Sequence, residues 1–186
     1  LKLDVKAAEP QGGLITKMLG LPGKPDFRAT IAGEGPLDRW QAQGDASADD
    51  RPILQLTASS TGAATDRKIA FDVTLPNLPM LPETIGPLVQ GGITASGTVH
   101  LAGAGGPIHI DTLKAETAAG IVSASGDVDP TGLLNLRVQA QLADAAAFRT
   151  LLPPELGWRS LDADLQIGGT IGTPRLTVDA TVGDLA

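Results

Sequence analysis

Apolar and polar residues alternate with a period of two along most of this chain. Between positions 27 and 34, for example, Phe27, Ala29 and Ile31 alternate with Arg28 and Thr30. Such alternation is typical of a β-strand with one buried and one solvated face. The same pattern predicts strands over 1–6, 27–34, 40–46, 54–58, 68–75, 93–101, 108–110, 122–128, 134–142, 161–167 and 176–182. The sequence therefore predicts an all-β protein built from a long series of antiparallel strands.

Three segments rich in Leu, Met or Ala interrupt the alternation, at 14–21, 76–89 and 144–152. We expect short helices or compact crossovers there, each facing or capping the apolar side of the sheet. In the third, Asp144 is the predicted N-cap and the Ala run favours helix. Phe148, Leu151 and Leu152 then fall on one side of that helix.

Proline positions indicate an internal repeat of about 70 residues. One set of prolines closes the three interrupting segments, and a second set follows in Gly-Pro turns. These prolines are Pro22, Pro82 and Pro153 in the first set, and Pro36, Pro107 and Pro174 in the second. Each unit is predicted to hold about four strands and one crossover. The predicted units of one continuous segment are 1–22, 23–90, 91–156 and 157–186.

The composition leaves two arrangements open for the apolar faces. Hydrophobic residues make up 42% of the chain but aromatic residues only 3%, so the apolar positions hold mid-sized aliphatic side chains. The sheet either packs on itself and on the short helices, or curls into a U-shaped trough. Glycines inside strands, such as Gly44, Gly97 and Gly126, permit sharp curvature.

The residues predicted to share the apolar face, and to line such a trough, are those at the apolar positions of each run. They are Phe27, Ile31, Trp40, Leu54, Leu56, Ile69, Phe71, Val73, Leu75, Ile93, Val99, Leu101, Ile108, Ile110, Val122, Val128, Leu134, Leu136, Val138, Leu142, Leu161, Leu165, Ile167, Leu176, Val178 and Val182.

Charge and composition exclude several classes of protein. The net charge is −7 and aromatic residues are scarce, which argues against a nucleic-acid partner. The chain has no Cys, which excludes disulfides and thiolate metal sites. No stretch predicts a transmembrane helix. Because the chain begins with Leu, we expect an internal fragment or processed product.

His100 and His109 are the only histidines. A tight hairpin centred on Ala104 and Gly105 would place them opposite each other on the polar face, at a spacing that suits weak zinc binding. The sequence puts no carboxylate obviously beside them. We therefore expect two solvated histidines and no metal site.

Other candidate chemistry has a simpler structural explanation. Asp127 and Asp129 precede Pro, Thr and Gly, which predicts a turn rather than a calcium loop. Asp162 and Asp164 alternate with apolar residues, so they belong to a solvent face and not to a glycosidase cleft. The glycine-rich segment 103–107 lacks the spacing and Lys of a phosphate loop. We expect no enzyme activity and no cofactor.

Two segments resemble a known family, 29–60 and 122–182. Each has a strand that ends in a Gly-x-Asp-like or Gly-rich turn; the second adds a small helix ending in Leu151-Leu152-Pro153. A strand ending in a G-x-x-G-x-P turn then follows, with its proline at Pro174. This pattern is similar to that of the TamB family of translocation and assembly module proteins, within the AsmA-like group.

The resemblance implies a function. Such proteins are anchored in the inner membrane of diderm bacteria, cross the periplasm, and carry a taco-shaped β-groove. They conduct phospholipids to the outer membrane, or assist β-barrel assembly with an Omp85-type partner that binds outside this segment. We therefore expect a periplasmic conduit section whose partners are phospholipid acyl chains. The alternatives are a chaperone that pairs with strands of outer-membrane proteins and an adhesin-like β-solenoid. In an excised fragment, exposed sheet edges predict edge-to-edge self-association.

Overall fold

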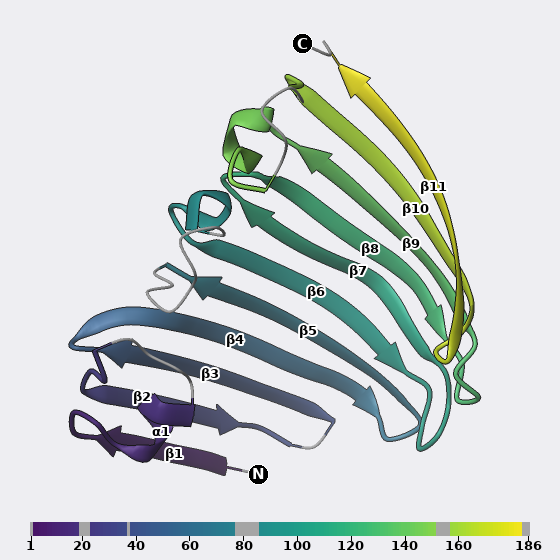
Figure 1. Ribbon diagram of the computed structural model, residues 1–186. Helices are drawn as coiled ribbons and strands as arrows, with labels where there is room; N and C mark the ends of the chain where they lie inside the picture. The colour runs from purple at the N-terminus through teal and green to yellow at the C-terminus, as the bar shows by residue number, and fades with distance from the viewer. Residues whose placement is uncertain (1, 19–22, 37, 77–85, 152–156, 184–186) are drawn as a thin grey trace.

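A computed structural model describes residues 2–18, 23–36, 38–76, 86–151 and 157–183. These residues form an all-β structure with one eleven-stranded antiparallel sheet, in which the strands follow one another in chain order. The strands are β1 (Lys2–Glu9), β2 (Phe27–Glu34), β3 (Arg39–Ala48), β4 (Arg51–Ala63), β5 (Asp66–Leu75), β6 (Ile93–Leu101), β7 (Ile108–Thr117), β8 (Gly120–Val128), β9 (Leu134–Leu142), β10 (Ser160–Thr170) and β11 (Thr173–Gly183). β1 and β11 form the two edges of the sheet, and the strand direction turns progressively between them (Figure 1).

Each predicted alternating run corresponds to one observed strand. Two strands extend well beyond their runs: β4 continues to Ala63 and β7 to Thr117. Each of these strands carries one extra residue relative to a neighbour. In the β3–β4 pair the register shifts between Ala46 and Ser47 of β3, and in the β7–β8 pair it shifts between Ile110 and Leu113 of β7. A bulge adds one residue to a strand and so breaks the alternation there. The pattern of period two therefore located the strands but underestimated the lengths of β4 and β7.

Short helices occur in three of the connections. They are α1 (Leu14–Met18) between β1 and β2, η1 (Gly86–Val89) between β5 and β6, and η2 (Ala145–Phe148) between β9 and β10. The expectation of crossovers is wrong, because each of these segments joins two neighbouring strands of a sequential sheet. β1, β5 and β9 run in the same direction, so the three connections lie at the same end of the sheet (Figure 1). The prolines predicted to close them, Pro22, Pro82 and Pro153, lie outside the described residues.

Few hydrophobic side chains are fully buried among the described residues. The one core cluster consists of Phe27, Ala46, Ala48 and Ile53, with Ala29 and Leu54 packed against it. It lies where β2 begins and β3 ends, at the end of the sheet that carries the α1 connection. The sheet therefore has a small core at one corner and a long remainder whose apolar side chains are only partly covered.

Candidate functional site

The strand register aligns apolar residues across the entire sheet. In an antiparallel pair, residues directly opposite each other project from the same face. One row of direct partners crosses all eleven strands. This apolar row is Leu3, Gly33, Ala42, Ala58, Phe71, Gly97, Leu113, Ala124, Val138, Leu165 and Val178. We call the side of the sheet to which this row belongs the apolar face.

The neighbouring row of direct partners has the opposite character. This polar row is Asp4, Ala32, Gln43, Thr57, Asp72, Ser96, Lys114, Ser123, Gln139, Asp164 and Asp179. Successive side chains of a strand project to opposite sides, so this row marks the polar face. The two faces of one sheet therefore differ in chemistry from edge to edge.

Every residue that the sequence predicted to share the apolar face has the position in its strand that places it there. Phe71, for example, pairs with Ala58 and Gly97, whereas Lys68 pairs with Thr61 and His100 on the polar face. Likewise, Leu136 lies opposite Ile167, and the adjacent Arg137 lies opposite Gln166. Contact of these side chains with lipid stays a prediction.

The predicted set of apolar-face residues omitted Leu3 and Val5 of β1, and simple alternation did not place two further large side chains, Leu113 and Ile53. Leu113 pairs with Gly97 and Ala124, and Ile53 belongs to the core cluster beside Leu54. Both follow or form a bulge, which shifts the alternation by one residue. The change of parity between Ile110 and Leu113 was the available signal.

Aromatic side chains of the apolar face cover glycines of the neighbouring strand. A β-carbon at Gly33 would clash with the indole of Trp40, and one at Gly97 would lie 2.8 Å from Cε1 of Phe71. The rings therefore occupy the space that a side chain would need. This arrangement compensates for the poor packing of glycine in a strand. The indole nitrogen of Trp40 is buried without a hydrogen-bond partner among the described residues.

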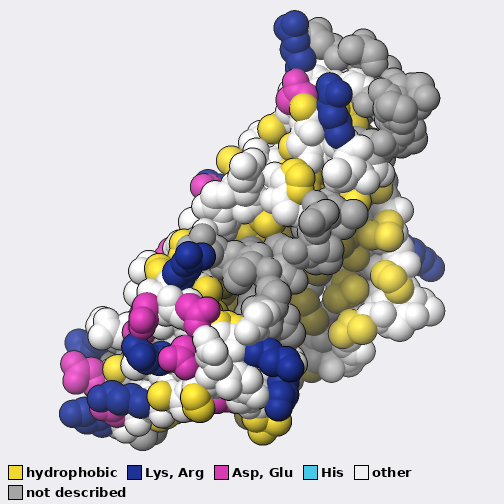
Figure 2. All heavy atoms as spheres, turned by 60° about the vertical axis from the view of Figure 1, so that its left-hand side comes forward, with side chains coloured by type: hydrophobic (Ala, Val, Ile, Leu, Met, Phe, Trp, Pro, Cys, Tyr) yellow, Lys and Arg dark blue, Asp and Glu magenta, His cyan; other side chains and the backbone are white. Residues whose placement is uncertain are grey.

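The described residues place no second layer of strands or helices over the length of the apolar face. On strands inside the sheet, Ile108 is 39% exposed and Val122 40%, and hydrophobic side chains lie at the molecular surface (Figure 2). The chain exposes 11675 Å², whereas a compact monomer of 18.9 kDa would expose about 8300 Å². A single-layer sheet accounts for this excess, because each strand has two accessible faces.

The third connection packs through aromatic side chains. Asp144 accepts a hydrogen bond from the backbone N–H of Ala146 at 2.7 Å and is the N-cap of η2, as predicted. Phe148 contacts Trp158, with ring centroids 5.7 Å apart, and the Trp158 indole donates to the carbonyl of Ala143 at 2.9 Å. Leu151 is exposed. Leu152 lies outside the described residues.

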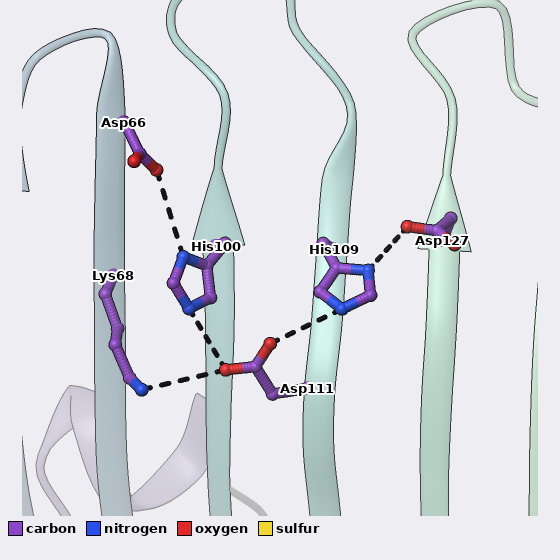
Figure 3. Close-up of polar contacts among 6 residues, drawn as sticks. All are labelled: Asp66, Lys68, His100, His109, Asp111 and Asp127. Carbon is purple, nitrogen blue, oxygen red and sulfur yellow. Dashed lines mark hydrogen bonds and ion pairs between the residues drawn. The ribbon is translucent and has the colours of Figure 1, made fainter.

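A polar network joins the two histidines on the polar face (Figure 3). His100 and His109 are direct partners on β6 and β7, as expected from the hairpin. The expectation that no carboxylate lies beside them is wrong. Nε2 of His100 is 3.1 Å from Oδ2 of Asp111, and Nε2 of His109 is 3.4 Å from Oδ1 of the same carboxylate. Asp111 is the extra residue of the β7 bulge, which turns its side chain toward both rings.

Further charges surround this network. Nδ1 of His109 lies 2.6 Å from Oδ1 of Asp127, Nδ1 of His100 lies 3.8 Å from Asp66, and Nζ of Lys68 lies 3.7 Å from Asp111. The hydrogen bond to Asp127 raises the pKa of His109 above its usual value, and the negative charge of Asp111 adds to this effect. No group of three or more metal-ligating side chains among the described residues has a geometry that could hold a metal ion.

The other acidic candidates have structural partners. Asp129 accepts hydrogen bonds from the backbone N–H and the hydroxyl of Thr131, and these bonds lower the pKa of Asp129. Asp164 accepts hydrogen bonds from Arg137 and Gln139, which lower the pKa of Asp164. The first group forms the turn after β8 and the second bridges β9 and β10 on the polar face. The Gly-rich segment 103–107 connects β6 to β7 as a hairpin loop.

Two of the hollows that the described residues outline lie over the polar face. One has a volume of about 520 Å³ and spans β1 to β5, where Lys2, Asp4, Gln43 and Asp72 contribute to its lining. A second one lies between Arg137, Gln166 and Arg175 near β10 and β11. Charged and amide side chains make both hollows unsuitable for an acyl chain.

Comparison with known proteins leaves the chain without an assigned family. No family model, no curated protein and no solved structure matches it. Within the described residues, no helix has the length and apolar character needed to cross a membrane.

Proposed function

We propose that this chain is a section of a trough that conducts phospholipids across the periplasm, with the apolar face as its lining. The observation that carries this proposal is the apolar row, which runs without a charged residue through eleven strands. A folded domain normally covers such a face with another layer. In this protein we assign the covering of the apolar face to a mobile apolar ligand instead of a second layer of protein.

A trough requires the sheet to bend strongly around its apolar side. Two features support this bend. Gly126 has a φ of 131° and pairs with Ile110, next to the Asp111 bulge; glycine and bulges both bend strands locally. Figure 2 shows hydrophobic side chains gathered in a hollowed region, with most of the visible charged side chains outside it.

The energetics favour an open, unselective lining. Burial of each acyl CH₂ contributes about 0.8 kcal/mol, so two chains of about fifteen groups gain about 24 kcal/mol at most. Leu, Val and Ala side chains offer dispersion and exclude water, but they form no hydrogen bond that would hold one lipid in place. The open side would leave the charged head group in water.

The remaining parts of the proposal rest on the resemblance to TamB-like proteins. The parent protein would be anchored in the inner membrane of a diderm bacterium and would bind an Omp85-type protein outside this segment. The activity would be transport without chemistry, in agreement with the structural roles of Asp129 and Asp164 in the turns and the sheet.

Site-specific cross-linking tests the proposal. A photoreactive residue replaces Val138 on the apolar face or, as the matched control, the adjacent Gln139 on the polar face. After irradiation in cells, mass spectrometry should find phospholipid attached at position 138 and little at position 139. Equal labelling at both positions would contradict the proposal. Cross-links to peptides without lipid would favour the chaperone alternative.

A further inference from the structure

Three polar side chains of the sheet have a buried atom without a hydrogen-bond partner among the described residues. The atoms are Nε1 of Trp40, Oγ of Ser60 and Nε of Arg67. They belong to β3, β4 and β5, three adjacent strands inside the sheet. Buried polar groups of native proteins nearly always have a partner, because an unpaired group loses the hydrogen bonds that water gave it. These three groups therefore call for a ligand or another explanation.

The strand register places all three side chains on the apolar face. Trp40 is the direct partner of Ser60, and Ser60 in turn lies opposite Ile69 of β5. Arg67 is two residues from Ile69 and so projects from the same face. Direct partners have β-carbons about 5 Å apart, and diagonal neighbours at about 7–8 Å are still within reach of long side chains. One ligand of modest size can therefore contact all three groups.

These groups lie near the strand ends, away from the helical connections. Arg67 is the second residue of β5 and Trp40 the second of β3, and both strands begin at the end opposite α1, η1 and η2 (Figure 1). A trough that follows the apolar row has the strand ends as its rims. From this rim inward, the apolar face presents Arg67, then Ser60 with Trp40, then Ala58 with Phe71. A cation, hydrogen-bond donors and hydrocarbon therefore follow one another along the strands.

We propose that this corner of the apolar face binds the head of a phospholipid, with Arg67 on the phosphate and with Ser60 and Trp40 on the ester carbonyls. A phospholipid presents the matching order of anionic phosphate, ester oxygens and acyl chains. Guanidinium and indole N–H groups only donate, and the Ser hydroxyl can donate as well, so all three suit a ligand whose polar atoms accept.

The side-chain types fit this assignment. The planar guanidinium of Arg matches the geometry of a phosphate, and no ion pair of the described residues involves Arg67. The carbon ring of Trp40 lies over Gly33, while its N–H remains to donate, which is how Trp serves at lipid–water boundaries. The site rests on the proposed function, because the acyl chains would occupy the apolar row beside it. It gives this corner a preference for phosphate-bearing lipids that the aliphatic lining lacks.

Calorimetric titration with short-chain lipids tests the site. The probes are dihexanoyl phosphatidylglycerol below its micelle concentration, dihexanoylglycerol, which lacks the phosphate, and inorganic phosphate. Arg67→Gln should weaken phosphatidylglycerol binding about tenfold, the effect of one charge-assisted hydrogen bond, and should leave dihexanoylglycerol binding unchanged. Ser60→Ala should weaken the binding of both lipids by a similar factor. The matched control is Arg39→Gln, which removes the same charge at the same strand ends on the polar face and should change neither affinity.

The indole of Trp40 gives a second test without any change at the site. In a Trp158→Phe background, Trp40 is the only tryptophan, so its indole N–H gives a single NMR resonance. This resonance should move downfield with either lipid, because both carry ester carbonyls, and should stay in place with inorganic phosphate. A resonance that ignores both bound lipids would remove Trp40 from the site.

The outcomes separate this site from the trough itself. Phosphatidylglycerol binding that is insensitive to Arg67→Gln, or equally sensitive to Arg39→Gln, would overturn the head-group site and leave the trough proposal standing. Inorganic phosphate that binds as tightly as phosphatidylglycerol, in a manner dependent on Arg67, would overturn the assignment to a lipid. A native chain that binds neither lipid would refute the proposed function and this site together. Circular dichroism establishes that each variant is folded.

Discussion

The aromatic ring of Phe71 lies over Gly97, its direct partner on the neighbouring strand. A β-carbon at Gly97 would be 2.8 Å from two atoms of this ring and 2.5 Å from Cδ2 of Leu113 on the other side. On the apolar face, Phe71 of β5 and Leu113 of β7 therefore pack against each other's strands across Gly97, the residue that β6 contributes to the apolar row. The large residues on both sides need the small one between them.

Gly97→Ala should destabilise the sheet because the new methyl group has no room. We expect the free energy of unfolding to fall by about 1–3 kcal/mol, the usual cost of overpacking, in urea denaturation. Gly168→Ala is the matched control: this strand glycine lies on the polar face and its β-carbon would meet nothing closer than 3.9 Å. Equal stability of both variants would contradict the close packing of Phe71 on Gly97.

The stability of the sheet should depend on the protonation of His109. Its pKa is raised in the folded state, first by the hydrogen bond to Asp127 and then by the charges of Asp127 and Asp111. The stabilisation is therefore fully present below the unfolded pKa of about 6.5 and is lost as the pH rises through the higher folded pKa. The network also contains Asp66, Lys68 and His100.

An NMR titration of the histidine ring protons measures this effect. His100→Gln leaves one histidine, so that the resonance of His109 is unambiguous. Adding Asp127→Asn should lower the pKa of His109, and the pH dependence of the melting temperature between pH 6 and pH 8 should become weaker. An unchanged pKa in that variant would show that Asp127 does not control the titration.

A carboxylate on the apolar face should affect lipid binding more than folding. Val138→Asp replaces a half-buried side chain of the apolar row. On a face open to water the new charge stays hydrated, so we expect a loss of about 1–2 kcal/mol in unfolding free energy, from lost packing. Phospholipid that copurifies with the chain should fall several-fold. Ser123→Asp, on the polar face beside Lys114, should change neither quantity. A loss of folding on Val138→Asp would instead indicate a filled core.

The aromatic contact in the third connection should hold that segment on the sheet. Phe148→Ala removes the ring that lies 5.7 Å from Trp158 and should lower stability by about 1–2 kcal/mol. In a Trp40→Phe background, Trp158 is the only tryptophan, and its fluorescence should shift to longer wavelength as water reaches the indole. Arg149→Ala, at the exposed end of η2, is the control. An unchanged spectrum in the Phe148 variant would exclude the contact.

The strands and their faces could be predicted from the sequence because the side chains of a strand alternate strictly. Val138 and Leu165 belong to different strands, yet the parity of each within its own run sufficed to place both on the apolar face. The N-cap of η2 was also predictable, since Asp144 bonds to a backbone group two residues away. Each of these features depends on neighbours along the chain.

Other features were decided only by the tertiary structure. The bulge at Asp111 depends on how β7 pairs with β6 and β8 at once, so its effect on the two histidines was not predictable from alternation. The sequential strand order likewise turned the expected crossovers into connections between neighbours. By itself the sequence determined which side chains share a face, because that follows from local backbone geometry. Only the assembled sheet decided which residues lie opposite one another, because register across strands depends on pairing between distant segments.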